Sequence, residues 1–154
     1  MKFQFDILSQ SRKNLLTLLA PYTTDQLNHI PSGFKNNLAW NLGHVIVSQQ
    51  LLCYKLSGLP LSIPQELVEK FRRGTVPEKP LNDQEINQLK SLATQTADKF
   101  REDYHKGIFK EYQGYQSQFG VKLECLEDAI VFNNTHEGLH LGYIMAMRKS
   151  IENY

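Results

Sequence analysis

Apolar residues recur at helical spacing in four long segments of the chain, and no segment alternates between apolar and polar positions for more than a few residues. The first segment covers about residues 5–20 and ends at Pro21. Its leucines form one side of the predicted helix. Its polar residues are expected elsewhere on the helix surface: Ser11, Arg12 and Lys13. This segment therefore predicts a helix with one buried side.

A second helix is predicted to begin after Asn36 or Asn37, because either side-chain oxygen can cap a helix N-terminus. It runs to about residue 57 and stops at Gly58. The connector that follows, residues 58–81, is longer than an ordinary loop in a compact domain. We expect a short helix inside it, over residues 64–73.

The third helix has the clearest signals at both ends. Asn82 and Glu85 have the spacing of a capping box, and Gly107 closes the C-terminus. Residues 108–120 are rich in aromatic residues and glutamine, which predicts an ordered loop with a short extended piece. A fourth helix follows over about residues 123–151, with three acidic residues near its positive N-terminal end.

These elements predict an all-α protein, a four-helix bundle with a long crossover connection between helices two and three. The length of 154 residues fits a single domain over residues 1–154. Such a chain can bury a core without disulfides or a structural metal.

Composition and charge exclude several classes of function. Apolar residues make up 41% and charged residues 21%, and the formal net charge is +1. No basic stripe is present, which argues against a nucleic-acid partner. No apolar run approaches the ~18 residues of a membrane span, and the N-terminus does not resemble a secretory signal. Cys53 and Cys125 form no C-x-x-C pair, so we predict reduced, buried thiols and a cytoplasmic location.

His136 and His140 are the most informative residues of the fourth helix. Their spacing of four places both imidazoles on one face, about 6 Å apart along the axis. A helix uses this geometry to supply two nitrogen ligands to one metal. The same face is mostly apolar, so the two rings are predicted to point into the core. The alternative is a pair of core histidines that are hydrogen-bonded to neighbouring side chains.

His44 favours the metal site over that alternative. It lies on the second helix with the apolar neighbours Trp40, Val47 and Leu51, so it is also expected to face the core. Three histidines from two helices match the three-ligand pattern of an open, catalytic-type metal site. Imidazole suits several divalent transition metals, and the sequence alone does not select one.

At these residues the chain resembles the DinB-like (DinB/YfiT) metalloprotein superfamily. The matching stretches are Trp40-Asn41-Leu42-Gly43-His44 and His136-Glu137-Gly138-Leu139-His140-Leu141-Gly142. The resemblance implies a four-helix bundle with a crossover and one divalent metal held by the three histidines. Zinc or nickel is expected first, with iron or manganese as alternatives. It also implies homodimers and, in characterised relatives, transferases and isomerases that use low-molecular-weight thiols. Many members carry Gln where this chain has Tyr143.

The stretch from His136 to His140 also matches the H-E-x-x-H pattern of zinc proteases, in which the glutamate is the general base. We weigh this reading lower, because only a short tail follows His140 to supply a third ligand. Glu137 is nevertheless the candidate catalytic residue, as a base or as a partner of the ligands. The alternative for Glu137 is a solvated helix residue.

The predicted function is that of a metal-dependent enzyme with a small-molecule substrate. Three neutral imidazoles leave the full charge of the ion, which would acidify a bound thiol or water at neutral pH. Thiol activation would give a transferase, and water activation a hydrolase. Arg72 and Arg73 are candidates to receive an anionic group, although such a pair is more often merely solvated. The remaining alternatives are a non-catalytic metal- or ligand-binding stress protein and a dimeric scaffold without metal.

Overall fold

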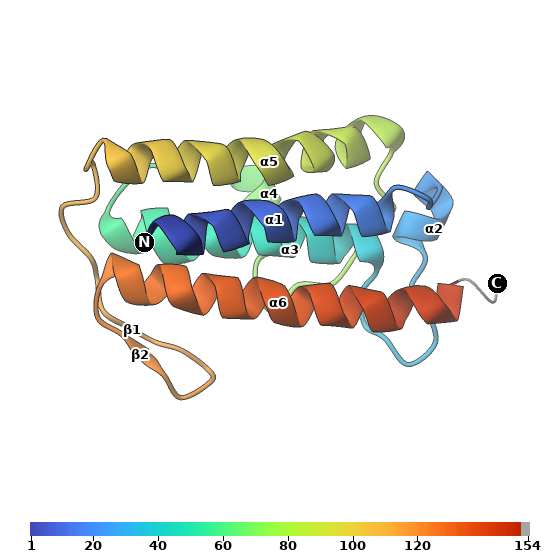
Figure 1. The fold of residues 1–154 in the computed structure, drawn as a ribbon. Helices are drawn as coiled ribbons and strands as arrows, with labels where there is room; N and C mark the ends of the chain where they lie inside the picture. Colours follow the sequence, from blue (N-terminus) through green and yellow to red (C-terminus); the bar gives the residue numbers. More distant parts are fainter. Residues whose placement is uncertain (152–154) are drawn as a thin grey trace.

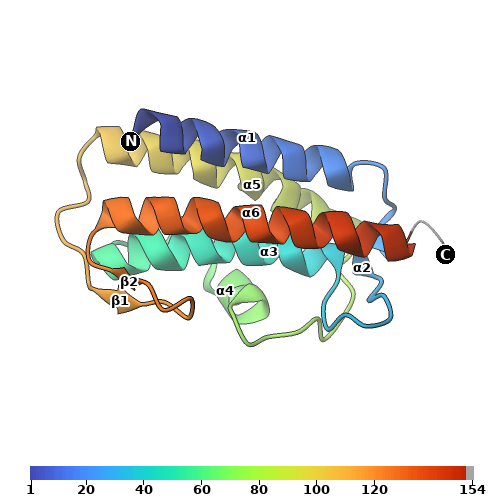
Figure 2. The same cartoon turned by 60° about the horizontal axis from the view of Figure 1, so that its bottom comes forward.

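We describe residues 1–151 of the chain from a computed structural model. Four long helices lie side by side: α1 (Lys2–Leu19), α3 (Leu38–Gln49), α5 (Asp83–His105) and α6 (Leu126–Ile151) (Figures 1 and 2). In Figure 1, α1 and α6 run in one direction, and α3 and α5 run in the opposite direction. The prediction of an all-α protein is therefore confirmed.

Six shorter elements complete the described chain. Two of them extend α3 without a break, the π-helix η1 (Gln50–Tyr54) and the 3₁₀ turn η2 (Lys55–Ser57). The other four are α2 (Thr24–Asn28), α4 (Gln65–Phe71), β1 (Tyr115–Gln116) and β2 (Lys122–Leu123). The two strands pair antiparallel and form a small hairpin beside α6 (Figure 1).

The helix borders follow the predicted capping signals. Asn37 accepts a hydrogen bond from the backbone N–H of Trp40 at 2.8 Å, which starts α3. Asn82 and Glu85 form the reciprocal capping box at the start of α5. Gly58 ends the α3 extension with φ of +69°, a left-handed conformation that glycine adopts without strain. The sequence prediction missed α2, which has its own capping box at Thr23.

The core consists of two clusters of buried apolar side chains. One joins α3, α4 and α5 to the C-terminal half of α6, and the other joins α1, η1 and α5 to the start of α6. None of the described helices has the length and apolar character needed to cross a membrane.

Helix α4 packs unusually close to α3 at one glycine. A Cβ atom on Gly43 would lie 2.5 Å from the ring of Phe71, so only a residue without a side chain fits there. The close approach brings the C-terminal end of α4 against the middle of α3. It thereby places backbone atoms of α4 beside His44.

Candidate metal centre

The three predicted histidines converge in the folded protein. His44 points from α3 toward His136 and His140 on α6, with ring centroids 5.2 and 4.8 Å away, and the latter two rings lie 4.6 Å apart. One nitrogen from each ring lies within 4.8 Å of the others. His44 is only 5% exposed, and the two rings on α6 are half-buried. Within residues 1–151 this is the only cluster of three or more such side chains that could hold a metal ion.

Backbone and ring contacts fix the orientation of His44. Its Nδ1 lies 2.7 Å from the carbonyl oxygen of Phe71, which can only accept, so Nδ1 carries the proton and donates it. The indole of Trp40 stacks on the imidazole at 4.6 Å and 11°. This tautomer leaves Nε2 with its lone pair, and the Ser48 hydroxyl lies 3.2 Å from that atom.

His140 is oriented in the same way by a side-chain amide. Its Nδ1 lies 2.8 Å from Oδ1 of Asn41, which is fully buried. The amide nitrogen of Asn41 donates to the Asn37 carbonyl at 2.8 Å and to Asn36 Oδ1 at 3.0 Å, so the amide oxygen must be the atom that faces the histidine. Nδ1 of His140 is therefore the donor, and Nε2 is left as an electron-pair donor. Metal-ligating histidines characteristically have an acceptor of this kind on their second nitrogen.

The third ring, His136, shows a buried nitrogen without a hydrogen-bond partner. Its Nδ1 is shielded from solvent, and no described group hydrogen-bonds to it. Such a buried polar atom costs free energy unless something binds it. The orphaned nitrogen, the two fixed tautomers and the nitrogen-only donor set together fit a divalent transition metal.

Burial keeps all three rings neutral at physiological pH. Desolvation lowers the pKa of His44 despite its bond to Phe71. Desolvation, with repulsion from His44 and Arg12, lowers the pKa of His136 to about 4. Desolvation and the other two histidines lower the pKa of His140 to about 3. Neutral imidazole is the form that binds a metal, so protons do not compete for these nitrogens at pH 7.

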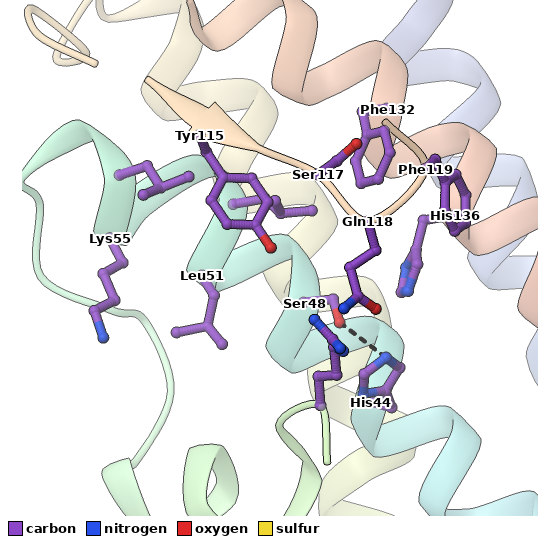
Figure 3. A pocket seen from close by; sticks show the side chains of 13 residues that line it. His44, Ser48, Leu51, Lys55, Tyr115, Ser117, Gln118, Phe119, Phe132 and His136 are labelled. Carbon is purple, nitrogen blue, oxygen red and sulfur yellow. Dashed lines mark hydrogen bonds between the residues drawn. The ribbon is translucent and has the colours of Figure 1, made fainter. Parts of the chain in front are cut away.

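A cavity of about 340 Å³ opens beside the histidines. His44 and His136 line one end of it, and Tyr115, Leu51 and Lys55 lie toward the other (Figure 3). The η1–η2 segment supplies one wall, and the β1–β2 hairpin with α6 supplies another. A small molecule in this cavity would therefore contact two of the three histidines.

Glu137 lies on a different side of α6 and does not line this cavity. Its side chain is fully buried, so the solvated alternative is wrong. Oε2 accepts from Arg12 Nε at 2.7 Å, and Oε1 accepts from Arg12 Nη2 at 2.8 Å and from Asn133 at 2.9 Å. Both carboxylate oxygens of Glu137 are therefore engaged by partners in the core.

Arg12 itself corrects the sequence analysis, which placed it away from the buried side of α1. The guanidinium is fully buried and also donates to the Val45 and Ala93 carbonyls at 3.0 and 3.4 Å. A signal was present in the sequence. Residue 12 follows Leu8 by four positions and precedes Leu15 by three, which places it on the leucine stripe.

The two cysteines and the arginine pair named from the sequence lie in different environments. Cys53 is fully buried, and burial, followed by the charge of Glu137, raises the pKa of its thiol. Cys125 is also free of a disulfide, but it is partly exposed, so the prediction of a buried thiol is wrong for this residue. Arg72 is exposed and pairs with Glu69 at 3.3 Å, whereas its neighbour Arg73 lines the cavity.

Asn41 is the site residue that sequence analysis did not single out. It lies three positions before His44, on the same side of α3, and therefore faces the same partner helix. A polar amide on an otherwise apolar helix face was the available signal.

Fold and site together define a helical protein with a three-histidine centre between two helices. A family model described as the DinB superfamily matches residues 7–144, and the chain therefore belongs to that superfamily. Among solved structures, the chain is similar to one described as a conserved protein from Enterococcus faecalis. The two share 12% sequence identity with a TM-score of 0.68, over 99% of this chain and 97% of the other. At that identity the likeness concerns the fold alone. No curated protein matches the sequence.

Proposed function

We propose that His44, His136 and His140 bind one divalent transition metal ion, zinc or nickel in the first instance, and that the protein is a transferase that uses a low-molecular-weight thiol. The observation that carries this proposal is the convergence of three neutral imidazoles from two helices beside a cavity. Two of these rings have their second nitrogen bound to a fixed acceptor. A bound ion of this class supplies positive charge that stabilises a thiolate at neutral pH.

Residues around the three histidines would hold the rings in the orientation that binds the ion. Phe71 and Asn41 hold two rings in the tautomer that leaves Nε2 free, and Trp40 covers one face of His44. The Ser48 hydroxyl lies beside that Nε2 and also lines the cavity, so it would offer a hydrogen bond to a ligand there.

Glu137 has a positioning role in this proposal. It neighbours His136 in sequence, and its pairing with Arg12 ties the middle of α6 to α1, α3 and α5. We therefore assign it to fixing the position of α6 rather than to proton transfer.

Two alternatives use the same site. In a hydrolase, a bound water would take the place of the thiol. In a non-catalytic metal- or ligand-binding stress protein, the cavity would serve recognition alone. Five leucine and phenylalanine side chains in the lining offer apolar surface to an organic ligand, which is why we place the transferase first.

The proposal extends to architecture. We propose a single domain over residues 1–154, in which the four long helices form the expected four-helix bundle and the connector around α4 is the crossover. The shared direction of α3 and α5, which a short turn could not join, and the packing of α4 on α3 support this arrangement (Figures 1 and 2). A homodimer and a cytoplasmic location stay predictions.

Metal content is the primary test. Protein purified without an affinity tag, then reconstituted with zinc or nickel, is analysed by elemental analysis beside His44→Ala and His140→Ala. His105→Ala, which removes an exposed histidine at the end of α5, is the matched control. We expect about one ion per chain in the unmodified protein and the control, and none in the two site variants. An unmodified protein that takes up no ion would refute the proposal.

Trp40 offers a second readout, since it is the only tryptophan of the chain and stacks on His44. Nickel titration should quench its fluorescence in the unmodified protein and not in His140→Ala. Consumption of a low-molecular-weight thiol with a chloronitrobenzene electrophile should then require the metal. A metal-loaded protein that consumes no thiol with any electrophile would favour the non-catalytic alternative.

A further inference from the structure

The cavity beside the metal centre carries charge of only one sign. Thirteen residues line it, and the charged side chains among them are Lys55 and Arg73. No aspartate or glutamate is present in the lining. Formal charge over the whole chain is nearly balanced, with 17 basic and 16 acidic residues, so this bias is local.

Neither cation is neutralised by a partner. Six basic residues of the described chain form exposed or half-exposed salt bridges, among them Arg72 with Glu69 and Lys70 with Glu85. Within residues 1–151, Lys55 and Arg73 have no carboxylate within salt-bridge distance. Their charges are therefore available to a ligand.

The walls between the ends of the cavity include five apolar side chains beside the polar Ser117 and Gln118. Leu51, Leu52 and Leu56 project from the η1–η2 segment. Across from them, Phe119 of the hairpin packs edge to face on Phe132 of α6, with ring centroids 5.4 Å apart. Phe119 is 53% exposed, so a ligand that covers it would remove apolar surface from water.

Both features together specify the ligand by its chemistry. The geometry points to a small amphipathic anion as the second substrate or ligand of this site: an aromatic or branched aliphatic body against the leucine and phenylalanine side chains, with one carboxylate-type group attracted by the positive charge that Lys55 and Arg73 give to the lining. The volume of about 340 Å³ is at the small end of the range for organic ligands. This inference rests on the proposed function, because it takes the histidine end of the cavity as the reacting end.

Two related ligand classes fit less well. A polyanion such as a nucleoside triphosphate would need more than two cations and a hydrogen-bonding phosphate cradle. An amphipathic amine would meet two like charges and no acid. The preferred charge is therefore a single negative one, which sets the design of the test.

The test compares three probes that share a body and differ in charge: 4-phenylbutyrate, 4-phenylbutylamine and 4-phenylbutanol. Their affinities are measured by isothermal titration calorimetry on zinc-reconstituted protein and on protein treated with a chelator. The variants are Lys55→Gln, Arg73→Gln and the double variant, with Arg72→Gln as the matched control. All three positions are exposed, so the fold should tolerate each change.

We expect 4-phenylbutyrate to bind at least about tenfold more tightly than the amine, with the alcohol between them. Each single variant should lose roughly threefold in affinity for the carboxylate, and the double variant should lose the charge preference. Arg72→Gln should leave it unchanged. Phe119→Ala should weaken all three probes alike, since it removes only apolar contact.

Equal affinity for the three probes, or a charge preference that survives in the double variant, would overturn the inference. A carboxylate preference that requires zinc and persists in the double variant would mean that the anion binds the zinc ion. That result would also overturn the inference, although it would support the metal site. Conversely, a preference that is present in chelator-treated protein and lost in the double variant supports the inference even if the chain takes up no metal. The failure of one proposal is thus distinguishable from the failure of the other.

Discussion

Removal of the charge of Glu137 is expected to destabilise the folded protein by about 3–5 kcal/mol, because it leaves a buried guanidinium without its counter-ion. Arg12 and Glu137 are both fully buried and make two parallel hydrogen bonds of 2.7 and 2.8 Å. Glu137→Gln keeps the shape and one amide oxygen but offers no negative charge. The two backbone carbonyls that also accept from Arg12 cannot replace it.

Urea denaturation followed by circular dichroism measures this loss. With an m-value of about 2 kcal/mol/M, the midpoint should fall by roughly 2 M. Against a total stability of about 5–15 kcal/mol for a typical domain, this is a large fraction. Arg12→Met should cost a similar amount, and the double variant Arg12→Met/Glu137→Met should cost much less than the sum. Lys70→Met, which breaks an exposed pair with Glu85, is the control and should leave the midpoint unchanged.

Single variants that lower the free energy of unfolding by less than about 1 kcal/mol would refute the reasoning, since they would mean that water reaches the pair. The Glu137→Gln variant also tests whether Glu137 acts as a base in catalysis. If Glu137→Gln retains its metal and its fold but loses thiol consumption selectively, the carboxylate is a base after all. A parallel loss of stability and activity matches the positioning role.

Three further outcomes are expected. Asn41→Ala should weaken metal affinity by about 10–100-fold, measured by competition with a chromogenic chelator, because His140 loses the acceptor that fixes its tautomer. Zinc at about 100 times its dissociation constant should stabilise the unmodified protein by about 2.7 kcal/mol and His44→Ala not at all, as thermal shifts would show. Burial raises the pKa of Asp103, but hydrogen bonds from Lys99 and Tyr54 outweigh it and leave the pKa low. That carboxylate therefore contributes stability which is lost as pH falls through its folded pKa. Tyr54→Phe should raise the pKa of Asp103 in an NMR titration, so the contribution is lost at higher pH.

Local signals in the sequence predicted most of the helical borders. Asn37, Asn82 and Gly58 act within a few residues of their own positions, so their effect can be predicted without knowledge of the fold. The short helix α2 was not predicted, because its capping box at Thr23 precedes only five helical residues, too few for a periodic pattern. The same reasoning explains the histidines: their faces follow from helical spacing, and their convergence follows once those faces are paired.

The parts that sequence reasoning missed depend on contacts between distant segments. Arg12 and Glu137 are separated by 125 positions, so the sequence does not show that they pair, although Arg12 lies on the leucine stripe of α1. The acceptor for His44 is a backbone carbonyl of Phe71, and carbonyl oxygens carry no sequence signature. The positive bias of the cavity arises from Lys55 and Arg73 on different elements, and only the fold brings them to one lining.

Gly43 has a consequence for protein engineering. A glycine inside a helix ordinarily invites replacement by alanine, which gains about 0.5–1 kcal/mol of helix stability. Here the new methyl group would meet the Phe71 ring at 2.5 Å and push α4 outward, together with the carbonyl that orients His44. Engineering for stability by helix propensity alone would thus stabilise the helix but disturb the orientation of the His44 imidazole. Position 43 should be held constant in any redesigned library of this chain, whatever its score for thermostability.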